Sequence, residues 1–190
     1  GSCAFECCVQ IQRIDIPINS ELQTIEDWAF AGSSIESIFI PPHVTKISKE
    51  AFCYCQMLQR IDIPTNSELQ TIETNAFLES SIESIYIPAS VIDLKDGWCN
   101  CIKKLTKVQV DPNNSRYSYL DGKMIICKTS KTSENYDKIV FCRQDIKETT
   151  IPSFIKTIGP IAFQNCQQLQ RIDISMNSEL QIIEKGAFAR

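Results

Sequence analysis

Residues 12–26 read QRIDIPINSELQTIE, and residues 59–73 read QRIDIPTNSELQTIE, so one segment returns almost letter for letter. A second signal is the dipeptide Ala-Phe, which recurs at 4–5, 29–30, 51–52, 76–77, 162–163 and 187–188, with Gly97-Trp98 in the same place once. Neighbouring copies are separated by roughly 21 to 25 residues, a period typical of leucine-rich-repeat solenoids. The repeat therefore predicts the fold.

Each unit carries the same apolar skeleton, as in Leu58, Ile61, Ile63 and Asn66. This spacing, L-x-x-I-x-I-x-x-N, is the strand signature of leucine-rich repeats. The signature recurs at 11–19, 105–113 and 169–177, and without its asparagine at 35–43 and 82–90. Alternation over I-x-I indicates a strand with one buried face, and a proline just after it ends the strand.

A unit of this length cannot bury its own apolar face, so neighbouring units must stack with their strands in register. We predict a right-handed, β-rich solenoid of about seven strand rungs, with a parallel sheet on its concave face. On the convex face we expect short strands and turns, with at most brief helical pieces around the Ala-Phe pairs.

One stretch departs from the period. The strand at 108–110 is followed by the next strand position only at 149–151. Between them, residues 124–127 and 139–142 are apolar and flank a polar tip at 128–137, a pattern that predicts a β-hairpin. We expect repeats over 1–116, an inserted hairpin over 117–142 and repeats over 143–190, all in one structural domain that is a fragment of a longer array.

The clearest unit, IPSFIKTIGPIAFQNC at 151–166, resembles the BspA-like leucine-rich repeats of bacterial and protist surface proteins. The segment DPNNSRYSYLDG at 111–122 is similar to an insertion often found in that family. The resemblance implies a cell-surface or secreted module that adheres to host or matrix proteins. An intracellular interaction scaffold that uses the same face is the alternative.

In such a repeat the residues flanking the two buried strand positions point outward from the concave sheet. This places a protein or glycan ligand against Arg13, Asp15, Phe39, Arg60, Asp62, Tyr86, Lys107, Gln109, Arg171 and Asp173, with Ser37 and Ser84 between them. Arginine and aromatic side chains are common in binding hot spots. Two other interpretations stay open: the Arg-Asp pairs form only solvated ion pairs, or the hairpin tip carries the binding.

The net charge of −4 comes from 19 basic and 23 acidic residues without a basic run, which argues against nucleic acid as a partner. No apolar stretch reaches the ~18 residues that a membrane helix needs, so we expect no membrane insertion in this segment. Open solenoid ends expose core residues, so end-to-end self-association is also expected.

Side chains that carry chemistry are few. His43 is the single histidine and falls in the turn after a strand, and the six glycines form no phosphate-binding loop. The Cys-x-Cys pairs at 53–55 and 99–101 would lie two rungs apart, which is too far for a shared zinc ion. We therefore expect no enzyme, no cofactor and no metal.

The ten cysteines fall at defined places in the repeat. Four of them follow the repeat aromatic by three residues and are expected to be buried free thiols: Cys8, Cys55, Cys101 and Cys166. Cys7, Cys53 and Cys99 are expected nearer the surface. Cys127 and Cys142 lie on facing hairpin strands and form the predicted disulfide, and Asn113 begins a glycosylation sequon that matters if the chain is exported.

Overall fold

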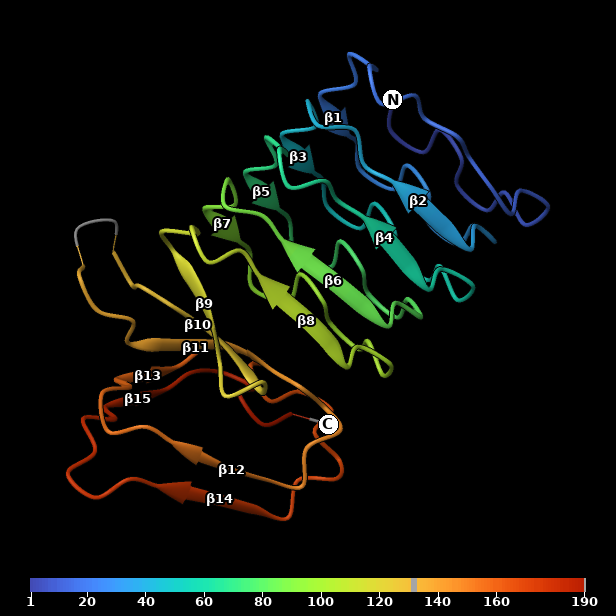
Figure 1. The fold of residues 1–190 in the computed structure, drawn as a ribbon. Helices are drawn as coiled ribbons and strands as arrows, with labels where there is room; N and C mark the ends of the chain where they lie inside the picture. Colours follow the sequence, from blue (N-terminus) through green and yellow to red (C-terminus); the bar gives the residue numbers. More distant parts are fainter. Residues whose placement is uncertain (131–132, 190) are drawn as a thin grey trace. The chain divides into compact units, whose positions relative to one another are not determined.

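A computed structural model of the chain describes residues 1–130 and 133–189. The chain forms two compact units, residues 1–115 (unit 1) and residues 116–190 (unit 2). Both are built from short strands that pair mainly in parallel (Figure 1).

Unit 1 contains two parallel four-stranded sheets, and successive coils contribute one strand to each (Figure 1). The sheet that we call the rung sheet consists of β2 (Ser37–Phe39), β4 (Arg60–Asp62), β6 (Ser84–Ile87) and β8 (Lys107–Val110). The second sheet consists of β1 (Thr24–Ile25), β3 (Lys46–Ile47), β5 (Thr71–Ile72) and β7 (Asp93–Leu94). The repeat signature thus forms strands at four of its predicted positions in unit 1, whereas the copy at 11–19 forms only a bridge from Arg13 to Ser37.

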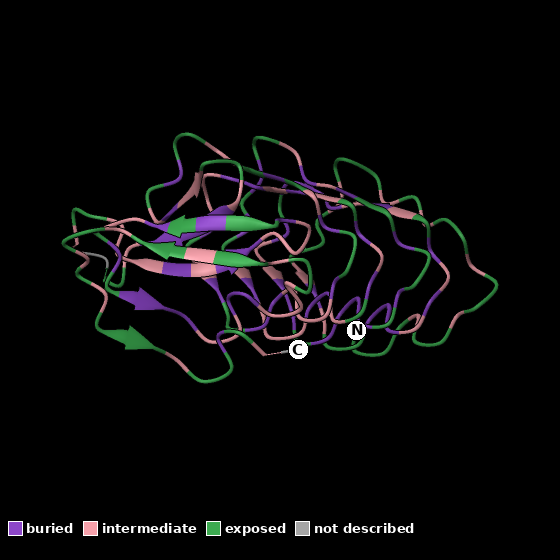
Figure 2. Cartoon of the chain, turned by 90° about the horizontal axis from the view of Figure 1, so that it is seen from below, coloured by how far each residue is buried: buried purple, intermediate pink, exposed green. Residues whose placement is uncertain are grey.

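The register of the rung sheet places equivalent repeat positions side by side. Ile38 pairs with Ile61, and Ile85 pairs with Val108. These apolar residues are buried while their strand neighbours are partly or fully exposed, an alternation visible in Figure 2. The burial pattern confirms that one face of each strand builds the core.

The Ala-Phe pairs form a column of rings inside unit 1. Phe5, Phe30, Phe52 and Phe77 stack at centroid distances of 5.2, 5.1 and 5.6 Å, and Trp98 meets Phe77 edge-on at 6.2 Å. Both geometries are favourable for aromatic pairs. The stacked rings therefore tie each coil to the next.

The expected short helical pieces are absent, since the structure assigns no helix in residues 1–130 and 133–189. In the five coils with Phe5, Phe30, Phe52, Phe77 and Phe163, the residue before the Ala-Phe pair has a positive φ, and so does the residue four positions later. In the coil of Trp98 the two positive-φ residues are Gly97 and Cys101. Examples of such pairs are Trp28 with Gly32, Glu50 with Tyr54, and Asn75 with Glu79. A left-handed residue cannot continue a right-handed helix, so two of them close each turn before a helix can form.

Unit 2 contains a five-stranded mixed sheet and a two-stranded parallel one. The mixed sheet has the order β15 (Ile182–Ile183), β13 (Thr157–Ile158), β11 (Lys138–Cys142), β10 (Met124–Cys127) and β9 (Tyr117–Leu120). The other sheet pairs β12 (Glu148–Ile151) with β14 (Arg171–Ile174).

The predicted hairpin is present as the antiparallel pair β10 and β11, but it is larger than the sequence suggested. Strand β9 adds a third antiparallel strand beside β10. On its other side β11 pairs in parallel with β13, so the hairpin's second strand also serves as a rung of the repeat stack. The core of unit 2 accordingly combines Ile126 and Ile139 of the hairpin with Ile158 and Phe163 of the repeats.

The predicted Cys127–Cys142 disulfide is wrong. Cys127 lies opposite Lys138, while Cys142 lies opposite Met124 at the other end of the hairpin, and the structure has no disulfide at either cysteine. An offset of about four strand residues corresponds to roughly 13 Å, beyond the ~7 Å limit for Cα atoms of a disulfide.

The predicted burial of the other cysteines is only partly confirmed. Cys55 is buried as expected, whereas Cys8, Cys101 and Cys166 are only half-buried. Cys53, expected near the surface, is fully buried, and its desolvation is the main reason that the pKa of the thiol rises to about 12. Cys53 lies in the turn that contains the Ala-Phe pair, next to the buried Phe52.

Among the residues that the structure describes, no helix is long and apolar enough to span a bilayer.

Candidate ligand-binding face

Outward side chains of the rung sheet form two columns that run from coil to coil in unit 1. We call them together the rung face. The first column contains Arg13, Ser37, Arg60, Ser84 and Lys107, joined by a bridge and the strand registers. The second contains Asp15, Phe39, Asp62, Tyr86 and Gln109. Eight of the ten predicted ligand residues thus lie on one continuous surface.

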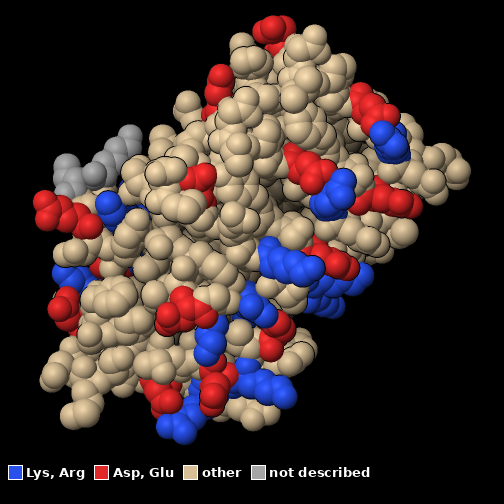
Figure 3. Space-filling model, in the orientation of Figure 1, with Lys and Arg blue, Asp and Glu red and all other residues tan. Residues whose placement is uncertain are grey.

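Arginine and aspartate on one strand pair with each other across this face. Arg13 Nε donates to Asp15 Oδ1 at 2.7 Å, and Arg60 donates from Nε and Nη2 to Asp62 Oδ2 at 3.0 and 2.9 Å. Figure 3 shows acidic and basic side chains adjoining in the region of the rung sheet. Such exposed pairs contribute only ~0 to 1 kcal/mol to stability, so their main effect is to orient the guanidinium groups.

Two hollows open where a serine lies between long basic side chains. Ser37 lies between Arg13 and Arg60, and Ser84 lies between Arg60 and Lys107. A serine side chain is too short to fill the space that its neighbours enclose. The resulting hollows have volumes of about 350 Å³ around Ser37 and about 500 Å³ around Ser84.

The two hollows adjoin and share three lining residues, Phe39, Arg60 and Asp62. Their serines are two rungs apart, a spacing of about 9.6 Å. Phe39 of β2 and Tyr86 of β6 supply aromatic walls. An extended ligand lying along the coils would therefore meet the same environment at regular intervals.

Tyr86 is fixed by a contact that the sequence analysis missed. Its hydroxyl donates a hydrogen bond to Oδ2 of Asp111, one coil further on. Desolvation, followed by the hydrogen bond and the charge of Asp111, raises the pKa of Tyr86 to about 12. The same hydrogen bond lowers the pKa of Asp111, whose other oxygen accepts from the Asn113 amide at 2.8 Å. The aromatic wall is thus held in place before any ligand arrives.

Lys107 differs from the two arginines of its column. It is exposed, and within residues 1–130 and 133–189 no carboxylate pairs with it. It lines the larger hollow together with Gln109, which is uncharged. This end of the rung face therefore offers a free cation to a ligand.

Arg171 and Asp173 belong to unit 2, where the structure places them beside Glu148 and Thr150 of β12. They form the same ion pair, from Arg171 Nε to Asp173 Oδ1 at 2.9 Å, with both side chains exposed. They are therefore not part of the ladder that runs through the rung face.

A fourth Arg-x-Asp pair was missed because it follows the insertion. Arg143 donates from Nε and Nη2 to Asp145 at 2.9 and 2.6 Å, and from Nη1 to the Gly122 carbonyl at 3.0 Å. The hydrogen bonds with Arg143 lower the pKa of Asp145 and raise that of Arg143. The pair connects the end of β11 to the β9–β10 turn. The recurring Arg-x-Asp motif in the sequence could have identified it.

The hairpin tip, the rival binding site, spans 128–137, and its residues 131–132 lie outside the described residues. Lys128 lies 5.3 Å from the centroid of the Tyr136 ring, and Asp137 accepts hydrogen bonds from the amide and hydroxyl of Thr129 at 3.0 Å. These contacts hold the base of the tip. They leave its binding role a prediction.

Two further predicted residues are exposed in turns. His43 Nδ1 lies 3.1 Å from Glu68 Oε1, and neither residue lines the hollows. Asn113 is exposed after β8, whereas Asn114 is buried and donates to the carbonyls of Pro88 and Val91 at 2.8 and 3.0 Å. The sequon asparagine is therefore the accessible member of the pair.

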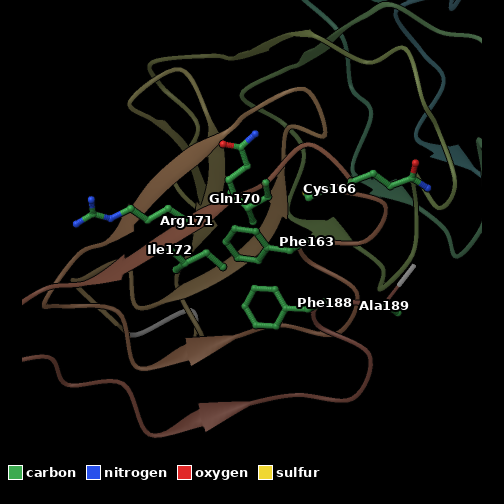
Figure 4. A pocket seen from close by; sticks show the side chains of 9 residues that line it. Phe163, Cys166, Gln170, Arg171, Ile172, Phe188 and Ala189 are labelled. Carbon is green, nitrogen blue, oxygen red and sulfur yellow. The ribbon is translucent and has the colours of Figure 1, made fainter.

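Unit 2 has a hollow of about 700 Å³ that the sequence did not predict (Figure 4). Phe163 and Phe188 stack in it with their centroids 4.9 Å apart, and Cys166, Ile172 and Arg171 line it further out. Phe188 is 43% exposed although it occupies a core position of the repeat. The hollow therefore opens directly onto the repeat core.

No group of three or more histidine, cysteine, aspartate or glutamate side chains in residues 1–130 and 133–189 is arranged to hold a metal ion.

Stacked parallel strands, equivalent apolar residues paired from coil to coil and a column of repeat aromatics define a leucine-rich-repeat solenoid. The sequence pattern described as BspA type leucine rich repeat region matches residues 1–116 and 123–190 in six copies. The chain therefore belongs to the BspA-type leucine-rich-repeat family.

Solved structures agree with this assignment. The pneumococcal vaccine antigen PcpA is 25% identical with a TM-score of 0.79, over 90% of this chain and 40% of that one. A leucine rich cell surface protein from Faecalibacterium prausnitzii is 22% identical with a TM-score of 0.69, over 97% of this chain and 50% of that one. A leucine-rich repeat protein from Eubacterium ventriosum is 22% identical with a TM-score of 0.68, over 90% and 49%.

The chain thus spans half or less of the length of these solved relatives. A comparison with curated proteins gave no match.

Proposed function

We propose that this chain is a non-enzymatic binding module at the cell surface, and that its rung face holds a protein or glycan ligand. The observation that carries the proposal is the pair of adjoining hollows on that face, with aromatic and charged walls. Two structural relatives support the location, since one is a vaccine antigen and another a cell surface protein.

The residues of the rung face suit adhesion better than catalysis. Arg60 and Asp62 are already paired, so a polar ligand can exchange hydrogen bonds with them without leaving a charge unpaired. Phe39 and Tyr86 offer apolar area, and Tyr86 is already oriented by Asp111. Prior orientation lowers the entropy lost on binding.

Binding to a panel of purified extracellular-matrix proteins and to a glycan array tests the proposal. The double variant Phe39→Ala/Tyr86→Ala should lose at least about tenfold in affinity for any probe that the wild type binds, the loss of roughly 1.4 kcal/mol typical of a hot spot. The matched control is Phe154→Ala, which removes an exposed aromatic side chain from unit 2. Equal loss in both variants, or no loss in the double variant, would contradict a site on the rung face.

The hairpin tip is tested in the same assay. Because β11 is part of the main sheet of unit 2, deleting the hairpin would damage that sheet. Point changes in the tip, such as Glu134→Ala with Asn135→Ala, avoid this problem. Loss of binding in these variants alone would move the site to the tip.

The alternative is an intracellular interaction scaffold that uses the same face, and ten cysteines outside disulfides are compatible with a reducing compartment. Mass spectrometry of the protein from its native source distinguishes the two compartments. A glycan on Asn113 supports export, and an unmodified, fully reduced chain supports the intracellular alternative.

A further inference from the structure

Unit 2 brings two cysteines together, Cys142 at the end of β11 and Cys166 in the turn after Phe163. The two side chains interact, and this interaction is the largest influence on the pKa of each thiol. The Cys166 sulfur also lies 3.6 Å from the carbonyl oxygen of Arg143, the residue after Cys142. Both cysteines belong to the core cluster of unit 2 or pack against it.

Unit 1 shows what the same place looks like without a second thiol. There Cys55 donates to the carbonyl oxygen of Phe30 at 3.0 Å, just as Cys166 donates to that of Arg143. The residue before Phe30 is Ala29, whereas the residue before Arg143 is Cys142. Unit 2 therefore has a thiol where the regular repeat has a methyl group.

The two thiols differ in access. Cys142 is 1% exposed, whereas Cys166 is half-buried and lines the hollow of about 700 Å³ in unit 2 (Figure 4). Their side-chain interaction lowers the pKa of Cys166 and raises the pKa of Cys142. A thiolate is the attacking form in disulfide exchange, so Cys166 is the thiol that reacts first.

We propose that Cys142 and Cys166 form a modification site for small disulfides, at which a mixed disulfide on Cys166 resolves into a Cys142–Cys166 cross-link. In the first step the Cys166 sulfur attacks one sulfur of a reagent RSSR, whose S–S bond breaks to release RSH. In the second step the Cys142 sulfur attacks Cys166, and the second RSH leaves. The two thiols lose two electrons and two protons, and RSSR is reduced to two RSH.

The cross-link joins β11 to the turn of the following coil. It closes a chain segment of about two dozen residues and so reduces the conformational freedom of the unfolded chain. Oxidation should therefore raise the unfolding temperature of unit 2 by several degrees. This inference does not depend on the ligand of the rung face.

The test treats the intact chain with oxidised glutathione and follows it by intact-mass and peptide-mapping mass spectrometry. In the wild type, peptide mapping should yield one linked peptide pair that contains Cys142 and Cys166 and is lighter by two hydrogens than the two reduced peptides. Adducts on the exposed Cys3 and Cys7 are scored separately. Cys142→Ser should stop at a single glutathione adduct on Cys166. Cys127→Ser is the matched control, a buried hairpin cysteine whose loss should leave the cross-link unchanged.

A second measurement needs no variant. In the reduced wild type, brief iodoacetamide treatment should label Cys166 at least about tenfold faster than Cys142, because reactivity follows exposure and thiolate content. A cross-link that involves Cys127, glutathione adducts that never resolve in the wild type, or faster labelling of Cys142 would each overturn the proposal.

Discussion

Residues 59–73 and 170–184 share the spelling QRIDI and NSELQ, yet they differ sharply in burial. In the first copy Ile63 is 9% exposed and Ile72 is 0% exposed. Their counterparts in the second copy, Ile174 and Ile183, are 57% and 56% exposed. The same residues are therefore core in one copy and surface in the other.

Strand neighbours account for the difference. In the first copy β4 pairs with both β2 and β6, and β5 pairs with both β3 and β7. In the second copy β14 pairs with β12 and β15 pairs with β13, each on one side. Burial in this fold is thus a property of a coil between two others, as expected for a quasi-one-dimensional solenoid.

The largest expected effect on stability concerns the phenylalanine of the repeat, compared between Phe77 and Phe188. Phe77→Ala removes a ring packed between Phe52 and Trp98 and should destabilise unit 1 by about 3–5 kcal/mol. Phe188→Ala removes a ring that stacks on Phe163 and is 43% exposed, so it should cost only about 1–2 kcal/mol. Urea unfolding of both variants measures the two values. Equal losses would show that neighbouring coils do not set the burial energy.

A smaller effect is expected where the insertion meets the repeats. A Cβ added at Gly159 would lie 2.8 Å from the Ile139 carbonyl oxygen and 2.8 Å from Lys138 Cε. Gly159→Ala should therefore cost about 1–3 kcal/mol through overpacking. Thermal unfolding gives the value.

The matched control is Ser48→Ala in unit 1. Ser48 donates its amide to the Ile25 carbonyl as Gly159 does to Ile139, but it already carries a Cβ there. Ser48→Ala should change the free energy of unfolding by less than about 1 kcal/mol. Similar losses at both positions would contradict the conclusion that β11 and β13 lie too close for a Cβ at Gly159.

The smallest expected effect is a change in the pKa of Tyr86. This residue of β6 occupies the repeat position that is Asp62 in β4 and Asp173 in β14. The pKa of Tyr86 is raised to about 12, above the ordinary ~10. Protonated Tyr86 thus favours the fold, and this contribution is complete below pH ~10 and is lost as the pH rises through about 12. Asp111→Asn should bring the Tyr86 pKa part of the way back, because desolvation remains.

Ultraviolet titration checks this, with Tyr86→Phe subtracted to isolate Tyr86 from the other four tyrosines. The lowered pKa of Asp111 has the opposite sign: its contribution is present above the usual carboxyl range and is lost as the pH falls through the lowered value. A Tyr86 pKa that Asp111→Asn leaves unchanged would show that the hydrogen bond is not formed in solution.

The sequence was sufficient to predict the strands of the rung sheet and the side chains that point outward from them. Alternation of Ile61 and Ile63 with Arg60 and Asp62 fixes which side chains point outward, and repetition fixes which of them become neighbours. The turns were less predictable. Their left-handed residues include tryptophan, glutamate and cysteine, types that do not mark such a conformation in a sequence.

The insertion was the least predictable region. Nothing in its spelling shows that β11 also pairs with β13, and the register of β10 and β11 shifts between Ile125 and Ile126. Facing strands therefore suggested that Cys142 meets Cys127. Only the role of β11 as a rung reveals Cys166 as its neighbour. Hydrogen bonds between coils, such as that of Tyr86 with Asp111, likewise require the stacking to be known first.

Hydrogen–deuterium exchange on peptides covering 59–73 and 170–184 tests the central claim most directly, because their nearly identical sequences give nearly identical intrinsic exchange rates. If neighbouring coils create the stability, amides of β4 and β5 should exchange at least about 100-fold more slowly than those of β14 and β15. Equal protection of the two copies would contradict the account.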